Sequence, residues 1–357
     1  VVPEEIRPIL PADPTYFYRN KLEFSCSSRR WLTETEIASQ IPLNRQAIGF
    51  HVPGFFDKVI DVERCLLQDE RSNLARNALR KEASQQSLSY YDVRAHTGFL
   101  RTLVIRNAVS TSDFMFLLVV GEDRPDCIEA LFEKLALELD FVSDWVWIFN
   151  PKANDTYTDL EPRVWKGKGY LNERLGDKQF RIGPCSFFQT NPKQAQHLFD
   201  LVREALEPGV ELLYDLYCGT GSIGIYVSDL AQRIIGVDYV ESSIADARIN
   251  VDLNGLTHLV FESGNLGRMF DDSFITRHGK PDSVVVDPPR AGIDPLVINQ
   301  LLTLLPEQIV YVSCNPATQA RDLALLAEHY RIVWLQPVDL FPQTLHVETV
   351  ANLRRKL

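Results

Sequence analysis

The C-terminal half of this 357-residue sequence predicts an α/β fold built on a doubly wound sheet of seven strands, and the N-terminal half predicts an α+β domain. From about residue 181, near-continuous apolar segments alternate with amphipathic ones, which is typical of parallel strands with helices on both faces of the sheet. Only the short segment 340–346 separates the last two strands, too little for a crossover helix. The final strand is therefore expected to run antiparallel.

The strand candidates of the C-terminal half are short, apolar and rich in β-branched residues. They lie at 211–217, 233–237, 259–263, 282–287, 308–313, 331–337 and 348–353. An amphipathic segment at 191–206 precedes the first of them and predicts a helix ahead of the sheet.

The N-terminal half contains shorter strand candidates between turns and helical segments. Strands are expected at 21–27, 47–52, 90–96, 101–109, 114–121 and 144–150, with helices at 73–84 and 127–140. This pattern favours an antiparallel sheet with helices packed on it. We expect one domain at residues 1–180, whose polar segment 151–180 leads into a second domain at 181–357.

The composition, 45% hydrophobic and 24% charged, is that of an ordinary globular protein. No apolar run approaches the ~20 residues of a membrane span, and the first residues do not resemble a secretory signal. Six scattered cysteines without a C-x-x-C pair exclude a familiar zinc site and fit reduced thiols. We expect a cytoplasmic, soluble monomer that binds no membrane and holds no metal in this chain.

The net charge of −11 argues against a general electrostatic attraction to nucleic acid. Basic residues do gather locally at 18–30 and 354–356. Either cluster alone is more simply explained as solvated surface charge.

A glycine-rich turn follows the first strand of the C-terminal half. In YDLYCGTGSIG, Gly219, Gly221 and Gly224 match G-x-G-x-x-G, and Asp238 ends the next strand, where it can accept hydrogen bonds from ribose hydroxyls. Together these features predict an adenosine-type cofactor, with NAD as one alternative. Asp215, four residues before Gly219, instead resembles the first motif of S-adenosylmethionine (SAM) enzymes.

The fourth strand ends in VVVDPPRAG, where Asp287 precedes two prolines. Prolines fix the backbone and remove N–H groups, so carbonyls and the Asp287 carboxylate are expected to face the site. D-P-P at this position resembles the motif of methyltransferases that act on bases.

The fifth strand ends at Cys314, at the same edge of the sheet, and Asn315 and Pro316 then suit the start of a helix. A helix N-terminus is expected to lower the pKa of the thiol. A thiolate is what methylation of uracil at carbon 5 requires, because its addition to carbon 6 makes carbon 5 nucleophilic. A base must later remove the proton from carbon 5.

Glu348 is the candidate for that base. It opens the reversed last strand, which begins at the edge where the parallel strands end, so it should meet Cys314 although 34 residues separate them. His346 is the alternative base, or else an orienting group.

These segments resemble the RNA (uracil-5-)-methyltransferase family over 181–357, through SFFQTN, DLYCGTG, GVDYVESSI, DPPRAG, YVSCNPAT and LFPQTLHVET. A fainter resemblance extends to YFYRNKLEFS near the start. The resemblance implies a Rossmann-like class I methyltransferase fold, SAM as methyl donor, Cys314 as nucleophile and Glu348 as base. It implies RNA as the partner. YVSCNPATQARD is closer to the branch acting on 23S rRNA than to the branch acting on tRNA.

The resemblance also implies the binding residues by position. Contacts to SAM are expected from Gln189, Tyr217, Gly219, Gly221, Asp238, Asn265 and Asp287. Contacts to the substrate are expected from Phe188, Gln189, Asp287 and Arg290. Phe188 and Gln189 can also be explained as the end of a strand before a helix cap.

The sequence departs from the family in two ways. Many members begin with a small β-barrel RNA-binding domain, and many rRNA-directed members hold a 4Fe-4S cluster with three closely spaced cysteines and a fourth. Cys65 in VERCLLQ matches the fourth ligand, but no triad precedes it here, so a cluster is expected only in a longer protein.

Two other functions fit parts of the pattern. An amino-group methyltransferase would use D-P-P, but such enzymes usually place an aromatic residue where this chain has Arg290, and they need no thiol. A non-catalytic protein that binds SAM and RNA would keep the fold without turnover.

Overall fold

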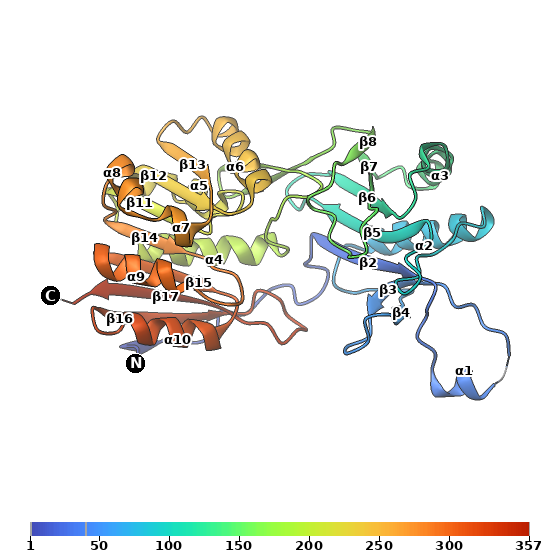
Figure 1. The fold of residues 1–357 in the computed structure, drawn as a ribbon, viewed down its shortest axis with the longest axis horizontal. Coiled ribbons are helices and arrows are strands. Elements are labelled where there is room, and N and C mark those ends of the chain that lie inside the picture. Colours follow the sequence, from blue (N-terminus) through green and yellow to red (C-terminus); the bar gives the residue numbers. More distant parts are fainter. Residues whose placement is uncertain (1, 40, 357) are drawn as a thin grey trace. The chain divides into compact units, whose positions relative to one another are not determined.

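A computed structural model describes residues 2–39 and 41–356, and the chain divides into two compact units (Figure 1). Unit 1 contains the described residues up to Thr15, the segment Arg174–Arg181 and the described residues from Ser186 on. Unit 2 contains Tyr16–Glu173 and Ile182–Cys185.

Unit 1 is built on a mixed sheet in the order β1-β16-β17-β15-β14-β11-β12-β13. Its strands are β1 (Glu5–Ile6), β11 (Val210–Leu216), β12 (Ala231–Asp238), β13 (Leu259–Ser263), β14 (Ser283–Val286), β15 (Gln308–Ser313), β16 (Tyr330–Val338) and β17 (Glu348–Arg355). Strand β17 lies between β15 and β16 and runs antiparallel to both, as predicted. The other neighbouring pairs are parallel.

The sheet has eight strands where the sequence predicted seven. The extra strand is β1, which pairs in parallel with β16 at the edge. It has only two residues, too few to show an alternating pattern. Its neighbourhood is fixed by side chains: Gln194 Nε2 donates to the carbonyls of Leu10 and Pro11.

The helices of unit 1 connect the strands. They are α4 (Pro192–Ala205), α5 (Ser222–Tyr226), α6 (Glu241–Leu253), α7 (Leu266–Met269), α8 (Asp272–His278), α9 (Pro295–Leu304) and α10 (Pro316–Leu326), with a 3₁₀ turn at Ser228–Leu230. Apolar side chains of α7, α8, α9 and α10 share one buried cluster with the strands. The predicted caps form, since Asn191 accepts from the Gln194 amide and Asn315 from the Ala317 amide.

Unit 2 contains a seven-stranded sheet in the order β4-β3-β2-β5-β6-β7-β8. The strands are β2 (Lys21–Ser27), β3 (Ala47–His51), β4 (Val59–Asp61), β5 (Leu100–Asn107), β6 (Phe114–Val120), β7 (Asp144–Phe149) and β8 (Arg163–Lys166). Only β6 and β7 pair in parallel, and α3 (Pro125–Glu138) connects them. The other helices are α1 (Glu34–Ala38) and α2 (Glu70–Gln85). Apart from the two large sheets, strands β9 (Leu171–Leu175) and β10 (Lys178–Ile182) form a two-stranded sheet, and residues Arg174–Arg181 within it belong to unit 1.

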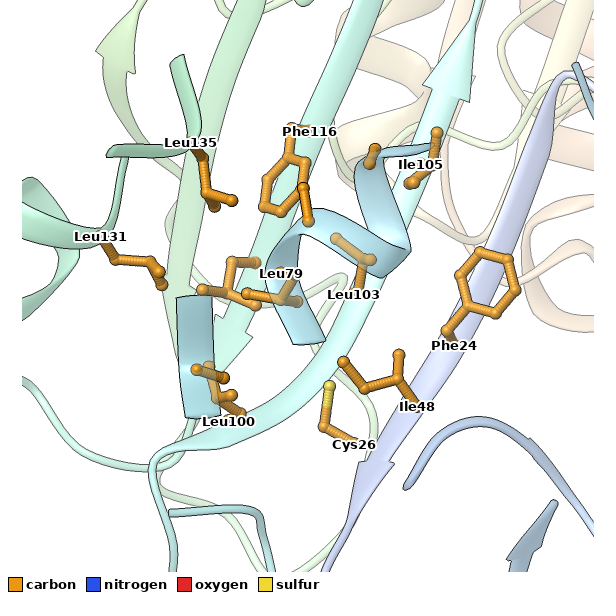
Figure 2. Packing of buried hydrophobic residues seen from close by; sticks show 14 of the residues in the cluster. Phe24, Cys26, Ile48, Leu79, Leu100, Leu103, Ile105, Phe116, Leu131 and Leu135 are labelled. Carbon is orange, nitrogen blue, oxygen red and sulfur yellow. The ribbon is translucent and has the colours of Figure 1, made fainter. Parts of the chain in front are cut away.

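The core of unit 2 lies between its sheet and helices α2 and α3. Figure 2 shows Leu79 of α2 and Leu131 and Leu135 of α3 beside Phe116 and Leu103 of the sheet. All five side chains are buried. The α+β architecture predicted for the N-terminal half follows from this packing.

One strand prediction for unit 2 is wrong. Residues 90–96 form no regular strand, only isolated bridges around a turn. The cause is Asp92, whose Oδ1 accepts from the amides of Arg94 and Ala95 and so bends the backbone. The polar segment 151–180 contains the short strands β8 and β9 and the start of β10, which showed no clear pattern in the sequence. Among the helices that the structure describes, none is both long enough and apolar enough to cross a bilayer.

Candidate active site

A cavity of about 680 Å³ lies at the carboxyl edge of the unit 1 sheet. In a doubly wound sheet this edge collects the loops that follow each parallel strand, and ligands bind there. The cavity is lined by segments that are far apart in the sequence: Phe187, Gln189, residues 217–220, Ser222, Ile223, residues 238–240, Ser243, residues 287–290, Cys314, Phe341, His346 and Glu348. Its size suits a nucleoside-sized ligand together with a base.

The loop after β11 needs glycine for two different reasons. Gly219 (φ +54°) and Gly221 (φ +73°) both adopt the left-handed conformation, which other residues enter at a cost. A Cβ at Gly219 would meet no atom within 4 Å, so its backbone faces open space in the cavity. A Cβ at Gly221 would lie 2.6 Å from the ring of Phe261. Gly219 therefore keeps room for a ligand, and Gly221 keeps room for the core.

Asp238, at the end of β12, holds this loop in place. Its Oδ2 accepts from the Gly219 amide at 2.9 Å, and its Oδ1 accepts from the Val240 amide at 2.8 Å. The carboxylate also lines the cavity. A carboxylate fixed beside a glycine loop is suited to accept hydrogen bonds from ribose hydroxyls.

Asp215 lies behind the loop and is fully buried. Its Oδ2 accepts from the Gly224 amide at 2.9 Å, while Oδ1 has no hydrogen-bond partner among the described residues. Burial raises the pKa of Asp215, the Gly224 hydrogen bond partly opposes this, and the nearby Asp287 and Asp238 add to the increase, so that the pKa is about 7. Asp215 therefore holds the end of the glycine loop through the Gly224 amide.

Cys314 and Glu348 are neighbours because of the strand register. The antiparallel ladder between β15 and β17 ends with the pair Ser313 and Thr349, and Cys314 and Glu348 are the residues immediately beyond that pair. They are close enough to interact electrostatically. Both residues line the cavity, and Glu348 is 5% exposed.

Glu348 holds its proton more strongly than an exposed glutamate. Burial, and then the nearby Asp287, raise its pKa to about 8, and Arg290 opposes both. Burial alone raises the pKa of Asp287 to about 7. The carboxyl groups at this edge therefore resist carrying several negative charges at once.

The expectation of a lowered thiol pKa at Cys314 is wrong. Burial raises that pKa above its usual value, and Glu348 and Asp287 raise it further. Arg290 and a backbone hydrogen bond act in the opposite direction but do not compensate. The helix start at Pro316 is present as predicted, yet burial and then the neighbouring carboxyl groups raise the pKa of the thiol.

Arg290 is held at the cavity by both its backbone and its side chain. Its carbonyl accepts from Asn315 Nδ2 at 3.0 Å and from Thr318 Oγ1 at 3.2 Å. Its guanidinium lies 2.9 Å from His346 Nε2. A guanidinium can only donate, so this contact engages His346 as a neutral acceptor. His346 is then less available as the base than Glu348.

Most of the sequence-predicted site residues line one cavity. They are Gln189, Tyr217, Gly219, Asp238, Asp287, Arg290, Cys314 and Glu348. Gly221 supports the same loop without lining the cavity. Asn265, the residue before α7, is not part of the lining.

Phe188 points into the core, with its ring 5.5 Å from that of Phe180. Its neighbour Phe187 lines the cavity instead and is 61% exposed. Phe187 was not predicted from the sequence, and neither was Tyr239, which lines the cavity and is 76% exposed. Because residues 183–191 form no strand and little helix, no periodicity showed which of the two phenylalanines faces outward.

Cys65 is buried, and its backbone is tied to the Asn73 side chain by two hydrogen bonds. Within residues 2–39 and 41–356, no cluster of histidine, cysteine, aspartate and glutamate side chains is arranged to hold a metal ion.

The topology and the cavity together define a class I SAM-dependent methyltransferase. The sheet order, the reversed last strand, the glycine loop after β11 and the acid at the end of β12 all agree with this class. Residues 162–356 match the family described as tRNA (uracil-5-)-methyltransferase. The chain belongs to this family, and it is an RNA (uracil-C5-)-methyltransferase.

Relatives with similar sequences extend over nearly the whole chain. A protein of Bacteroides thetaiotaomicron, named an uncharacterized RNA methyltransferase, is 44% identical over 98% of this chain and 78% of its own length. A protein of Porphyromonas gingivalis with the same name is 43% identical over 99% of this chain and 77% of its own length. These matches confirm the predicted family and enzyme class.

A solved structure is also similar over most of the chain. It is the Pyrococcus abyssi tRNA (uracil-54, C5)-methyltransferase in complex with S-adenosyl-L-homocysteine, with a TM-score of 0.78 and 32% identity, covering 97% of this chain and 78% of that one. The predicted fold class is confirmed, and a SAM-dependent reaction is supported.

Proposed function

We propose that this chain methylates carbon 5 of a uridine in RNA through a covalent bond between Cys314 Sγ and carbon 6 of the base. The observation that carries the proposal is that Cys314 and Glu348 lie immediately beyond the last pair of the β15–β17 ladder and line the cavity that contains the glycine loop. A nucleophile and a base at one edge are what the two halves of this reaction need.

The glycine loop and Asp238 fit SAM as the methyl donor. The open space at Gly219 admits a ligand against the backbone, and the fixed Asp238 carboxylate suits the ribose. Tyr217, Gln189 and Asp287 would complete the contacts, because they line the same cavity. When bound, SAM supplies an electrophilic methyl group.

Cys314 begins the chemistry as a thiolate. Its sulfur forms a bond to carbon 6, and the electron pair of the C5=C6 double bond moves toward carbon 5 and the adjacent carbonyl. Carbon 5 would then be nucleophilic and would accept the methyl group, while the electron pair of the S–CH3 bond would leave with the donor as a neutral thioether. The product of this step carries both the new methyl group and the original hydrogen on carbon 5.

Glu348 completes the reaction as a carboxylate. It takes the proton from carbon 5, the C–H electron pair restores the C5=C6 double bond, and the sulfur leaves as a thiolate. Arg290 supports both groups, since its charge favours the thiolate and the carboxylate. The exposed ring of Phe187 in the cavity provides a face on which the uracil can stack.

The proposal for the substrate is a ribosomal RNA, on the strength of the segment 311–322. Transfer RNA is the second candidate, favoured by the substrate that the name of the P. abyssi enzyme gives. We further propose residues 1–180, most of which belong to unit 2, as the substrate-side domain, and a cytoplasmic monomer as the working form. Mapping of the methylated uridine in bulk RNA incubated with the enzyme and labelled SAM would decide between the two RNAs.

The test of the mechanism is Glu348→Gln. The glutamine cannot accept the carbon-5 proton, so methylation should proceed and elimination should stall. The expected result is a protein–RNA adduct that survives denaturing electrophoresis and carries label from methyl-labelled SAM. Adding Cys314→Ala should abolish the adduct. Glu307→Gln is the matched control, because Glu307 lies at the other end of β15 beside Arg355.

Three outcomes would contradict parts of the proposal. Normal turnover by Glu348→Gln would move the role of base to His346. Methylated product from Cys314→Ala would remove the covalent step and favour an amino-group methyltransferase. SAM binding by the wild-type chain without any methylated RNA would favour a non-catalytic binding protein.

A further inference from the structure

We propose that unit 2 carries its own RNA-binding site, a pocket beside Trp31 that receives an unpaired nucleotide of the substrate RNA outside the target uridine. The inference rests on the proposed function, because it requires the substrate to be RNA. The pocket has a volume of about 420 Å³. It is lined by Arg30, Trp31, Leu32, Thr33, Glu34, Ile37, Arg45 and Lys58, which come from the β2–β3 connection and the start of β4.

Backbone hydrogen bonds build the floor of this pocket. The Arg30 amide donates to the Arg45 carbonyl at 2.7 Å, and the Trp31 amide donates to the Val59 carbonyl at 2.7 Å. Three segments are thereby tied together around Trp31. In Figure 1 the β2–β3 connection that carries α1 extends away from the sheet of unit 2, where a partner can reach it. A preformed site binds with a smaller entropy cost than one that must be ordered.

The lining contains three cations and one carboxylate, Glu34, and Lys58 acts electrostatically on the neighbouring Asp57. Arg30 is fixed by Glu36 at 2.7 Å and by the Asn44 carbonyl at 2.9 Å. The side chains of Arg45 and Lys58, in contrast, form no ion pair or hydrogen bond with any residue that the structure describes. The chain as a whole carries a net charge of −11, so these two cations stand out. A phosphate backbone is the polyanion that such charges complement.

Exposed aromatic rings gather at the same place. Trp31 is 40% exposed and Phe55 49%, and their ring centroids lie 5.4 Å apart. Phe56 is 66% exposed and lies under Arg94, whose guanidinium carbon is 5.4 Å from the ring centroid. Large aromatic side chains on a surface usually mark an interaction site. Rings beside unpaired cations are the combination that binds single-stranded nucleic acid, by stacking on bases while neutralising phosphates.

The two chemical features favour RNA over an acidic polypeptide. An acidic peptide would use Arg45 and Lys58 but would gain little from the exposed faces of Trp31 and Phe55. An unpaired nucleotide uses both features at once. The pocket therefore adds affinity for RNA that the acidic chain as a whole does not provide.

The test compares three variants of the full chain in binding a fluorescein-labelled, single-stranded RNA of 20 random nucleotides. Arg45→Ala with Lys58→Ala should weaken binding and lower the slope of log affinity against log salt by about 1.4, since each phosphate contact on a single strand contributes about 0.7. Trp31→Ala should weaken binding roughly 5- to 100-fold with an unchanged slope, as expected for a lost stacking contact. Trp31→Phe should recover most of that loss.

Lys134→Ala with Lys166→Ala is the matched control, because both lysines belong to unit 2, are exposed and form no ion pair with a described residue. This control should bind the RNA as the wild type does. All variants should bind SAM with wild-type affinity and give a wild-type circular dichroism spectrum.

Two results would overturn the site. Wild-type RNA affinity and salt slope in the Arg45→Ala, Lys58→Ala variant would show that the pocket does not bind RNA. If that variant instead lost binding to poly-glutamate while keeping RNA, the partner would be an acidic polypeptide. Either result leaves the proposed function intact as long as Glu348→Gln forms its adduct. If the wild-type chain methylates no RNA at all, the proposed function itself fails.

Discussion

The surroundings of Cys314 and Glu348 favour the protonated form of both side chains. Both must be deprotonated to act, the thiol as nucleophile and the carboxyl as base, yet burial and neighbouring carboxyl groups raise both pKa values. A raised pKa means that the active form is populated only at higher pH. With the pKa of Glu348 near 8, the elimination step and therefore the rate of turnover should rise as the pH increases through about 8.

The positive charge of Arg290 lowers the pKa values of both Cys314 and Glu348 and so limits their increase. Arg290→Ala should raise both pKa values further, so the midpoint of the plot of kcat against pH should move to higher pH. Arg290→Lys keeps the charge and should keep the midpoint, even if the rate falls. The measurement is steady-state release of methylated RNA from pH 6 to 10 at saturating RNA and SAM. A lower rate with an unchanged midpoint in the alanine variant would mean that Arg290 acts on the RNA alone.

Some properties of these residues were predictable from the sequence, and others were not. The positions of Cys314 and Glu348 followed from strand ends, because a reversed strand must begin at the edge where its parallel neighbours end. Their pKa values depend on Asp287 and Arg290, which lie more than 20 residues away from Cys314 in sequence. Charges that meet only after folding leave no local pattern, so the sequence favoured the helix start and missed the carboxyl groups.

Some helices and strands were predictable from the sequence, and others were not. Helix α4 and strand β17 were predictable because each has a strong apolar period or a constraint on its direction. Strand β1 was not predictable, because two residues carry no period. The turn at residues 90–96 was mistaken for a strand because its aromatic and β-branched composition masked the turn formed by Asp92.

Gly219 and Gly221 in the loop after β11 and Gly255 after α6 all have positive φ, but an added methyl group would meet different surroundings at each. Gly255→Ala, at the end of α6, meets nothing within 4 Å and should lose only the roughly 1 kcal/mol of the left-handed backbone. Gly219→Ala has the same backbone cost, but its methyl group enters the cavity, so SAM affinity should also fall, by tenfold or more. Gly221→Ala presses on Phe261 and should destabilise the fold the most.

Thermal unfolding and SAM titration calorimetry of the three variants separate these effects. Equal SAM affinities for Gly219→Ala and Gly255→Ala would show that the cofactor does not approach the loop at Gly219.

The molecule as a whole combines an acidic chain with an RNA substrate. Its net charge of −11 argues against a general attraction to nucleic acid, but the net charge does not reveal where individual cations lie. The structure shows that Arg29, Arg30 and Arg94 form ion pairs with carboxylates, whereas Arg45 and Lys58 at the Trp31 pocket do not.

The division into two compact units depends on contacts of the first residues with β16, which the amino-acid composition does not encode.

Buried carboxyl groups in unit 1 should make the stability of that unit depend on pH in an unusual direction. Asp215 and Asp287 have folded-state pKa values of about 7, far above the usual value of 3.8. Between these values the folded state holds protons that the unfolded state has released. The free energy of unfolding should therefore decrease as the pH rises from about 4 to 7, whereas salt-bridged carboxylates give the opposite trend.

Asp215→Asn tests this directly, because an asparagine oxygen can still accept from the Gly224 amide but cannot ionise. The variant should lose less stability than the wild type as the pH rises, with a difference on the order of a few kcal/mol by pH 8, since each pKa unit corresponds to about 1.4 kcal/mol. Asp229→Asn is the control of opposite sign. Its carboxylate is paired with Arg203, which lowers its pKa, so this variant should lose stability at neutral pH and match the wild type in acid.

Hydrogen exchange of the β11 and β14 amides, measured from pH 4 to 8, reports on unit 1 alone. Parallel stability curves for Asp215→Asn and the wild type would show that Asp215 is ionised in the fold, with a partner for its Oδ1 that balances the charge.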